Sequence, residues 1–243
     1  MKHLLIAGRA GAGKTTLIKE LAQRLRGCPV DGFYTEELRE DGQRLGFWLS
    51  SLDGRQALLA HRHSDSPHRV GVYRVNVPVL DDMAVTIMRR AIRESLILFI
   101  DEIGKMELLS HPFQQTLEEA LDRGPRIVGT VGVQHFPFLD TLKRRRDVEL
   151  VPLSLNTWKP ILEELTARLT ALCDEDEHVR ALQREADRIC ELIVSDDVPE
   201  IDIEIQQVKL RETMARWFPD KQMLYQLLYE SRFKRLWQQF RQG

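Results

Sequence analysis

The sequence predicts an α/β fold in which a mostly parallel sheet carries helices on both faces, with an antiparallel meander beside the sheet and an α-helical extension after it. Three observations predict this fold. Short apolar runs alternate with stretches whose apolar residues recur every three or four positions. The run at 96–100 is apolar throughout, as a strand buried on both faces is. Apolar residues make up 43% of the 243 residues, which can support a packed core.

A glycine-rich turn lies near the start of the chain. It follows an apolar run at 4–7, which predicts a strand, and it precedes helical spacing over 16–25. Gly8, Gly13, Lys14 and Thr15 complete the pattern G-x-x-x-x-G-K-[ST]. Glycines let successive amide groups surround phosphate oxygens, the lysine adds positive charge, and the threonine hydroxyl suits Mg²⁺. We expect the nucleotide-binding residues to be Gly8, Arg9, Ala10, Gly11, Ala12, Gly13, Lys14, Thr15 and Thr16.

The middle of the chain predicts the rest of the sheet. Residues 30–62 predict the antiparallel meander, because turn signals at 41–42 and 53–54 separate strand-like stretches. The remaining segments alternate between helix and strand, which is typical of parallel sheets. Helices are expected over 78–94, 111–123, 136–146 and 157–173, and strands over 126–133 and 147–153.

Two carboxylates, Asp101 and Glu102, follow the buried run at 96–100. In a phosphate-loop fold, the end of such a strand lies beside the loop, so Asp101 is expected to complete a Mg²⁺ site with Thr15. Side chains alternate along a strand, so Glu102 points elsewhere and is placed to orient or deprotonate an attacking water. The alternative is that the two acids only make the end of the strand soluble.

Four stretches together resemble a known family, the THEP-type nucleoside-triphosphatases, which include the cancer-related nucleoside triphosphatase. They are the glycine-rich turn 8–17, and the segments 32–37, 69–73 and 101–108, and the resemblance extends over about residues 1–170. It implies a RecA-like P-loop domain, here 1–173, that hydrolyses ATP, GTP and other nucleoside triphosphates with Mg²⁺ and broad base tolerance. By position it implies a phosphate role for Lys14, metal roles for Thr15 and Asp101, and a catalytic role for Glu102.

The resemblance leaves three further residues with open roles. Arg69 and Lys105 are candidate catalytic residues that would neutralise charge in the transition state, as an arginine finger does. Alternatively, Arg69 is a surface residue and Lys105 forms a salt bridge with Glu107 or Glu36. Asn156 is a candidate contact to the base. The chain departs from the family at two positions: Ala10 replaces a usual proline, and Thr157 stands where an arginine is common.

Residues 174–243 lie outside the resemblance and predict an α-helical extension. Residues 174–204 contain twelve acidic and three basic side chains, and residues 205–243 contain three acidic and eight basic ones, so the two halves are expected to pair. Tyr225, Tyr229, Phe233 and Trp237 form an aromatic stripe at helical spacing. The stripe either packs on the chain itself or provides a surface for a protein partner or for self-association.

The leading function is a Mg²⁺-dependent hydrolase acting on nucleoside triphosphates. One alternative is a nucleoside or nucleotide kinase, with the basic run 143–146 as a lid; another is a nucleotide-gated interaction module whose output is the extension. The net charge of -2 argues against nucleic acid and membrane partners. The three cysteines are far apart, and no apolar run approaches membrane-spanning length, so we expect a cytoplasmic location.

Overall fold

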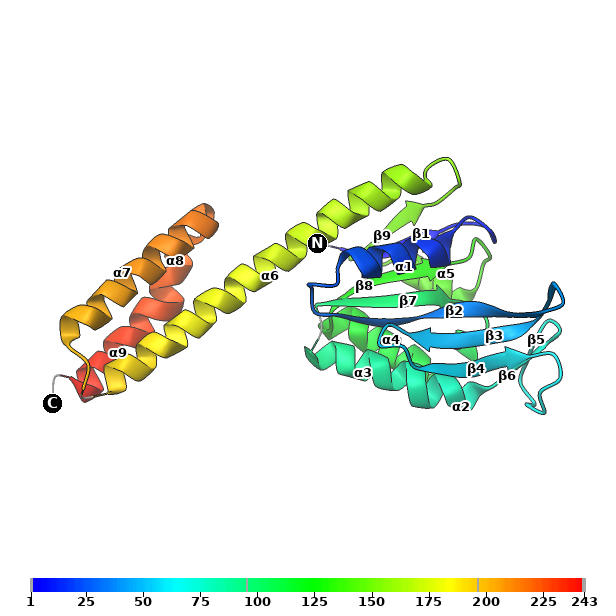
Figure 1. The fold of residues 1–243 in the computed structure, drawn as a ribbon, viewed down its shortest axis with the longest axis horizontal. Helices are drawn as coiled ribbons and strands as arrows, with labels where there is room; N and C mark the ends of the chain where they lie inside the picture. Colours follow the sequence, from blue (N-terminus) through cyan, green and yellow to red (C-terminus); the bar gives the residue numbers. More distant parts are fainter. Residues whose placement is uncertain (1, 95, 196, 242–243) are drawn as a thin grey trace. The chain divides into compact units, whose positions relative to one another are not determined.

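The computed structural model describes residues 2–94, 96–195 and 197–241 (Figure 1). The chain divides into two compact units, Met1–Ala171 and Leu172–Gly243. Among the described residues, no helix combines the length and the apolar composition that a membrane crossing requires.

The described part of the first unit contains one nine-stranded sheet, whose strand order is β5-β6-β4-β3-β2-β7-β8-β1-β9. Neighbours from β2 to β9 in this order are parallel, and neighbours from β5 to β2 are antiparallel. The strands are β1 (His3–Ala7), β2 (Val30–Glu40), β3 (Gln43–Ser51), β4 (Gln56–His61), β5 (Arg69–Val70), β6 (Tyr73–Val75), β7 (Ile97–Ile103), β8 (Arg126–Val131) and β9 (Val148–Pro152).

Strand β2 joins the two halves of the sheet. Its first residues, Val30–Phe33, pair in parallel with β7, and its later residues pair antiparallel with β3. Gly32 lies opposite Phe99 in this junction, and a Cβ atom on Gly32 would lie 2.3 Å from the Phe99 carbonyl oxygen. The predicted meander is present and extends further than expected, because residues 69–75 add β5 and β6 at its outer edge.

Helices cover both faces of the sheet, as predicted. Figure 1 shows α1 (Lys14–Arg24) on one face and α3 (Val85–Glu94) and α4 (His111–Arg123) on the other. Helix α2 (Val77–Val79) leads into α3 through a π-helical turn at Leu80–Ala84. Helix α5 (Pro137–Lys143) packs into the same core as α3 and α4. The Ser110 hydroxyl accepts a hydrogen bond from the Phe113 amide and so caps α4.

The expected helix at 157–173 is much longer in the structure. Helix α6 runs from Trp158 to Val194 without a break. Glycine and proline are absent between residues 161 and 198, so no residue in that range interrupts the backbone hydrogen bonds of the helix.

The second unit packs the end of α6 against α7 (Glu200–Trp217), α8 (Gln222–Tyr225) and α9 (Ser231–Phe240). A 3₁₀ turn at Pro219–Lys221 precedes α8, and a π-helical turn at Gln226–Glu230 joins α8 to α9. The oppositely charged halves are joined by two ion pairs, Lys221 with Glu175 at 3.0 Å and Arg232 with Asp187 at 2.7 Å.

The aromatic stripe packs inside this unit. Tyr225 and Phe233 are 6% and 3% exposed, and Tyr229 and Trp237 pack against the same core. The Tyr225 hydroxyl also donates to the Gln207 carbonyl at 3.0 Å. The stripe therefore stabilises the helical unit itself and does not form an open surface for a partner.

Candidate functional site

The glycine-rich turn connects β1 to α1. Gly11 and Gly13 have φ angles of 78° and 83°, in the left-handed region that glycine adopts readily, and Gly13 caps α1. A Cβ atom on Gly8 would lie 2.9 Å from the Leu153 carbonyl oxygen. These glycines allow the backbone to turn sharply, so the amides at the start of α1 can face an anion.

Lys14 begins α1, and its side chain is buried beneath the turn. The ammonium group donates to the carbonyl oxygens of Gly8 at 3.1 Å and Arg9 at 3.4 Å. It also lies 3.7 Å from a carboxylate oxygen of Glu102. The lysine thus connects the turn to the end of β7.

Asp101 is 1% exposed and accepts hydrogen bonds on both carboxylate oxygens. The Thr15 hydroxyl donates to one oxygen at 2.6 Å, and the Thr130 hydroxyl of β8 donates to the other at 2.5 Å. Burial raises the pKa of the Asp101 carboxyl, while the two hydroxyl groups and nearby Lys14 act in the opposite direction. Thr15 and Asp101, the two predicted metal ligands, are therefore adjacent.

Glu102 is half-buried beside Lys14. Burial raises the pKa of its carboxyl; Lys14 opposes this rise, and Asp101 adds to it. A raised pKa brings a carboxylate closer to the range in which it can accept a proton from water. The predicted separation of roles between Asp101 and Glu102 fits this geometry, since Asp101 bonds to two threonines and Glu102 faces the lysine.

A third carboxyl, Glu107, supports the segment that follows β7. It is 4% exposed and accepts a hydrogen bond from the Gly104 amide at 3.0 Å. Burial, together with the charges of Glu102 and Asp101, raises the pKa of Glu107 to about 8. The Glu107 carboxyl therefore holds the backbone of Gly104, which lies beside Glu102.

A cavity of about 180 Å³ lies between the turn after β1 and the segments after β7 and β8. Its polar side chains are those of Arg9, Lys14, Glu102, Lys105 and Gln134, and its apolar ones include Val133, Phe136 and Leu139. The Lys105 ammonium lies 4.9 Å from the centre of the Phe136 ring. The salt bridges considered for Lys105 are not formed, because Glu107 bonds to Gly104 and Glu36 bonds to Lys19.

Of the remaining sequence-predicted residues, Arg69 lies away from this cluster, whereas Asn156 is two residues before Trp158, whose indole bonds to Gly13. Arg69 is on β5, the edge strand five positions from β7 in the sheet, and its guanidinium donates to the Gly71 carbonyl at 2.9 Å. Asn156 is exposed in the turn between β9 and α6. Arg9, Ala10, Gly11 and Thr16 are exposed on the turn, and Ala12 is buried within it.

Comparison with known proteins places the chain in a family. The sequence model described as NTPase matches residues 3–166. The nucleoside-triphosphatase THEP1 of Thermotoga sp. (strain RQ2) is 43% identical over 166 residues, covering 68% of this chain and 94% of the relative. The human cancer-related nucleoside-triphosphatase is 34% identical over 179 residues, covering 68% and 94%. The chain belongs to this NTPase family.

Two solved structures of the NTPase family resemble the chain. The crystal structure of THEP1 from Aquifex aeolicus has a TM-score of 0.62 and 33% identity, covering 67% of this chain and 96% of that one. The solution structure of the human cancer-related nucleoside triphosphatase has a TM-score of 0.62 and 32% identity, covering 70% and 98%. The predicted family and the P-loop fold are confirmed.

Within this NTPase site, sequence reasoning assigned no role to Thr130 or Trp158, and it considered Lys143 only as part of a kinase lid. The Trp158 indole donates to the Gly13 carbonyl at 3.1 Å, and Lys143 donates to the Gly132 carbonyl at 3.1 Å. Thr130 could have been found from its position at the end of a strand predicted beside the loop. No sequence pattern predicted the contact of Trp158 with the turn, because a single aromatic residue at the start of a helix can pack in many ways.

Proposed function

We propose that the chain hydrolyses nucleoside triphosphates to the diphosphate and phosphate, with water as the nucleophile. The observation that carries the proposal is the approach of Glu102 to Lys14 at 3.7 Å beside the glycine-rich turn. Lys14 and the backbone amides of residues 8–16 bind the phosphates. Glu102 orients a water molecule and accepts its proton, and Lys105, which lines the same cavity, neutralises developing charge.

The residues present fit a Mg²⁺ ion. Thr15 and Asp101 are oxygen donors in direct contact, and Mg²⁺ is usually held by one or two such protein groups together with substrate phosphates. The Thr130 hydroxyl fixes the second Asp101 oxygen and so orients the carboxylate. When bound, the ion neutralises phosphate charge. Removal of divalent cations with EDTA is expected to abolish phosphate release.

The cavity favours water over a larger acceptor. Its volume of about 180 Å³ is below the range of about 300–1,000 Å³ that small-molecule pockets occupy. The basic run 143–146, which was considered as a kinase lid, forms other contacts in the structure. Lys143 donates to Gly132, and Arg145 pairs with Asp122 and Asp147. These contacts weigh against a nucleoside or nucleotide kinase.

Broad base tolerance is part of the proposal. The exposed Asn156 makes no side-chain hydrogen bond within the described residues that would fix it as a base contact. We also propose that residues 1–173 form the hydrolase domain and residues 174–243 a helical extension. The family match, which ends at residue 166, supports this division.

The deciding experiment measures phosphate release from ATP and GTP with Mg²⁺ and without a second substrate. Glu102→Gln is expected to lower turnover by roughly 10²–10⁴-fold while leaving nucleotide binding nearly unchanged, because the amide cannot accept the proton. Glu118→Gln, an exposed change on α4, is the matched control and keeps wild-type turnover. Equal turnover in all three proteins would remove Glu102 from the proposed role.

A nucleotide-gated module is the second candidate, favoured by one contact. Trp158, the first residue of α6, bonds to Gly13 of the phosphate-binding turn, and the same helix continues into the second unit. Limited proteolysis near residues 195–221 should then change when a non-hydrolysable triphosphate is added. Identical cleavage with and without the nucleotide would reject gating.

A further inference from the structure

Helix α7 is apolar on two opposite faces. Its inner face is buried in the core of the helical unit: Ile203 is 0%, Leu210 2% and Met214 5% exposed. Its outer face bears an exposed aliphatic stripe, defined as Ile201, Ile205 and Val208, which are 60%, 43% and 55% exposed. The spacing of four and three residues places these three side chains on one side of the helix, opposite the buried face.

Such an arrangement is unusual for a helix with one side in water. A surface helix normally has a single apolar stripe, and a helix that is apolar on both sides is normally covered on both. Isolated exposed aliphatic residues are common, but three in register on one face point to an interaction surface.

Charged residues border the outer stripe in a regular pattern. Asp202 and Lys209 lie along one side of it, and Glu204 and Arg211 lie along the other, as the helical repeat requires. On each side the acid precedes the base by seven residues, so these four side chains border the first half of the stripe with negative charge and the second half with positive charge. All four side chains are exposed, and within the described residues none of them forms an ion pair. Glu212, an exposed acid on the same face one turn beyond Val208, ends the aliphatic stripe.

We propose that this outer face of α7 binds the same face of a second copy of the chain, with the two helices antiparallel. A two-fold axis near Gln206 and Gln207 would place Ile205 of each copy opposite Val208 of the other. It would also bring each acidic half onto a basic half. On one side Asp202 meets the second copy's Lys209, and on the other Glu204 meets the second copy's Arg211, each within one helical turn.

The charge pattern selects the second copy, antiparallel, as the occupant. A parallel pair of α7 helices would place acids against acids and bases against bases, which is repulsive. In the antiparallel pair Asp202 and Glu204 each face a base of the second copy, one on each side of the stripe.

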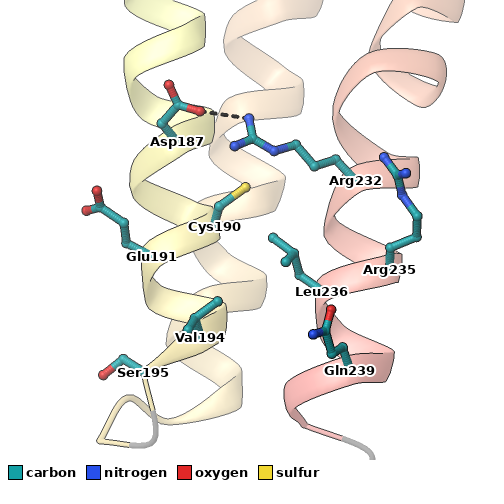
Figure 2. A pocket seen from close by; sticks show the side chains of 9 residues that line it. All are labelled: Asp187, Cys190, Glu191, Val194, Ser195, Arg232, Arg235, Leu236 and Gln239. Atoms are coloured by element: carbon teal, nitrogen blue, oxygen red, sulfur yellow. Dashed lines mark hydrogen bonds and ion pairs between the residues drawn. The ribbon is translucent and has the colours of Figure 1, made fainter.

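The pocket between α6 and α9 is a weaker candidate for such an interface. It has a volume of about 920 Å³ and lies between Asp187, Cys190, Glu191 and Val194 on one helix and Arg232, Arg235, Leu236 and Gln239 on the other (Figure 2). Two of the charged side chains that face each other across this pocket already form an ion pair, because Arg232 lies 2.7 Å from Asp187. The charges that border the α7 stripe have no such partner in the described unit.

The first test is sedimentation velocity of the full chain over a concentration series extending to the hundred-micromolar range. A reversible rise in mass from 28.3 kDa towards twice that value is expected. Ile205→Lys should raise the dimer dissociation constant more than tenfold, because it places a charge in the centre of the stripe. Val179→Lys, at an exposed apolar position on α6, is the matched control and should leave the constant within twofold of wild type.

The second test reverses the charges. The double variants Asp202→Lys/Glu204→Lys and Lys209→Glu/Arg211→Glu should each be monomeric, since each carries one sign of charge along the stripe. An equimolar mixture should form heterodimers, and the quadruple variant should again form homodimers. Because each double variant is also measured alone, association that appears only in the mixture cannot result from altered folding of either protein.

A wild-type chain that stays monomeric throughout the series would overturn the proposal. So would wild-type association in Ile205→Lys, or a mixture of the double variants that remains monomeric. If the stripe instead covers another part of the same chain, Ile205→Lys would change protease sensitivity at every concentration without any change in mass, and that result also overturns the proposal. Phosphate release is independent of these outcomes, so the hydrolase assignment is tested separately.

Discussion

Three carboxyl groups, Asp101, Glu102 and Glu107, lie close together at the end of β7, and burial raises the pKa of each of them. Lys14 is the cation nearest to the first two, and it lowers the pKa of both. Glu107 differs from these two because its hydrogen-bond partner is a backbone amide rather than a cation. Its neutral form is therefore the favoured form in the folded protein at neutral pH.

The raised pKa of Glu107 predicts a pH-dependent stability. The pKa is about 8 in the folded protein and 4.5 when unperturbed, so between these values the folded state binds the proton more tightly than the unfolded state. The free energy of unfolding should therefore fall as pH rises from 4.5 to 8, and this group should contribute about 2–4 kcal/mol of that fall.

Glu107→Gln should remove this part of the pH dependence, because the amide keeps an acceptor for the Gly104 amide and does not titrate. Urea unfolding at pH 5 and pH 8 measures the difference. Glu118→Gln should retain the wild-type dependence. A wild-type slope in Glu107→Gln would mean that Glu107 is ionised in the folded protein.

At the scale of elements, the antiparallel part of the sheet, which contains β3 to β6, is joined to the parallel part through one strand, β2. Strand β2 approaches β7 so closely at Gly32 that a Cβ atom would lie 2.3 Å from the Phe99 carbonyl oxygen and 2.8 Å from the Phe99 Cβ. The φ angle of Gly32, 151°, is also one that other residues rarely adopt. The pairing of β2 with β7, which joins the antiparallel part to the parallel part of the sheet, therefore requires glycine at this position.

Gly32→Ala is expected to lower the free energy of unfolding by about 2–4 kcal/mol, because the two strands must separate to admit the methyl group. Gly27→Ala is the matched control, since a Cβ atom there meets no atom within 4 Å. Chemical denaturation of both variants tests this. Equal stability of the two would show that β2 and β7 can shift apart at little cost.

The elements differ in how far the sequence could predict them. The bounds of α4 follow from Ser110 as a cap and Gly124-Pro125 as a stop, and both signals are local. Arg69 could not be placed from sequence, because its distance from Lys14 depends on the strand order, which puts β5 at the edge. Trp158 and the outer stripe of α7 were not found either, because each depends on which side of a helix the packing leaves free.

For the whole molecule, the two units differ in their relation to known proteins. The relatives match the first unit, with its turn, its buried aspartate and its cavity. The second unit has its own core of aliphatic and aromatic side chains, internal ion pairs and a stacked His178–Trp217 pair at 4.3 Å. A core of its own indicates that the extension is an ordered helical module rather than a flexible tail.

Removal of residues 174–243 is expected to leave phosphate release from ATP within about threefold of the full chain, because every residue proposed to contact nucleotide, metal or water lies before residue 157. The same truncation should abolish the concentration-dependent rise in mass. The full-length Ile205→Lys variant separates loss of the second copy from loss of the helices themselves. Turnover that falls in the truncated chain but not in Ile205→Lys would assign the extension a direct role in catalysis.

The hydrogen bond from Trp158 to Gly13 also gives the chain a built-in optical reporter. Indole emission depends on the polarity and hydrogen bonding around the ring, and this ring touches the turn that must accommodate phosphate. The Trp158 indole bonds directly to the turn, so its emission should change when nucleotide is added. Binding could then be followed in real time, without a label, even in the slow Glu102→Gln variant.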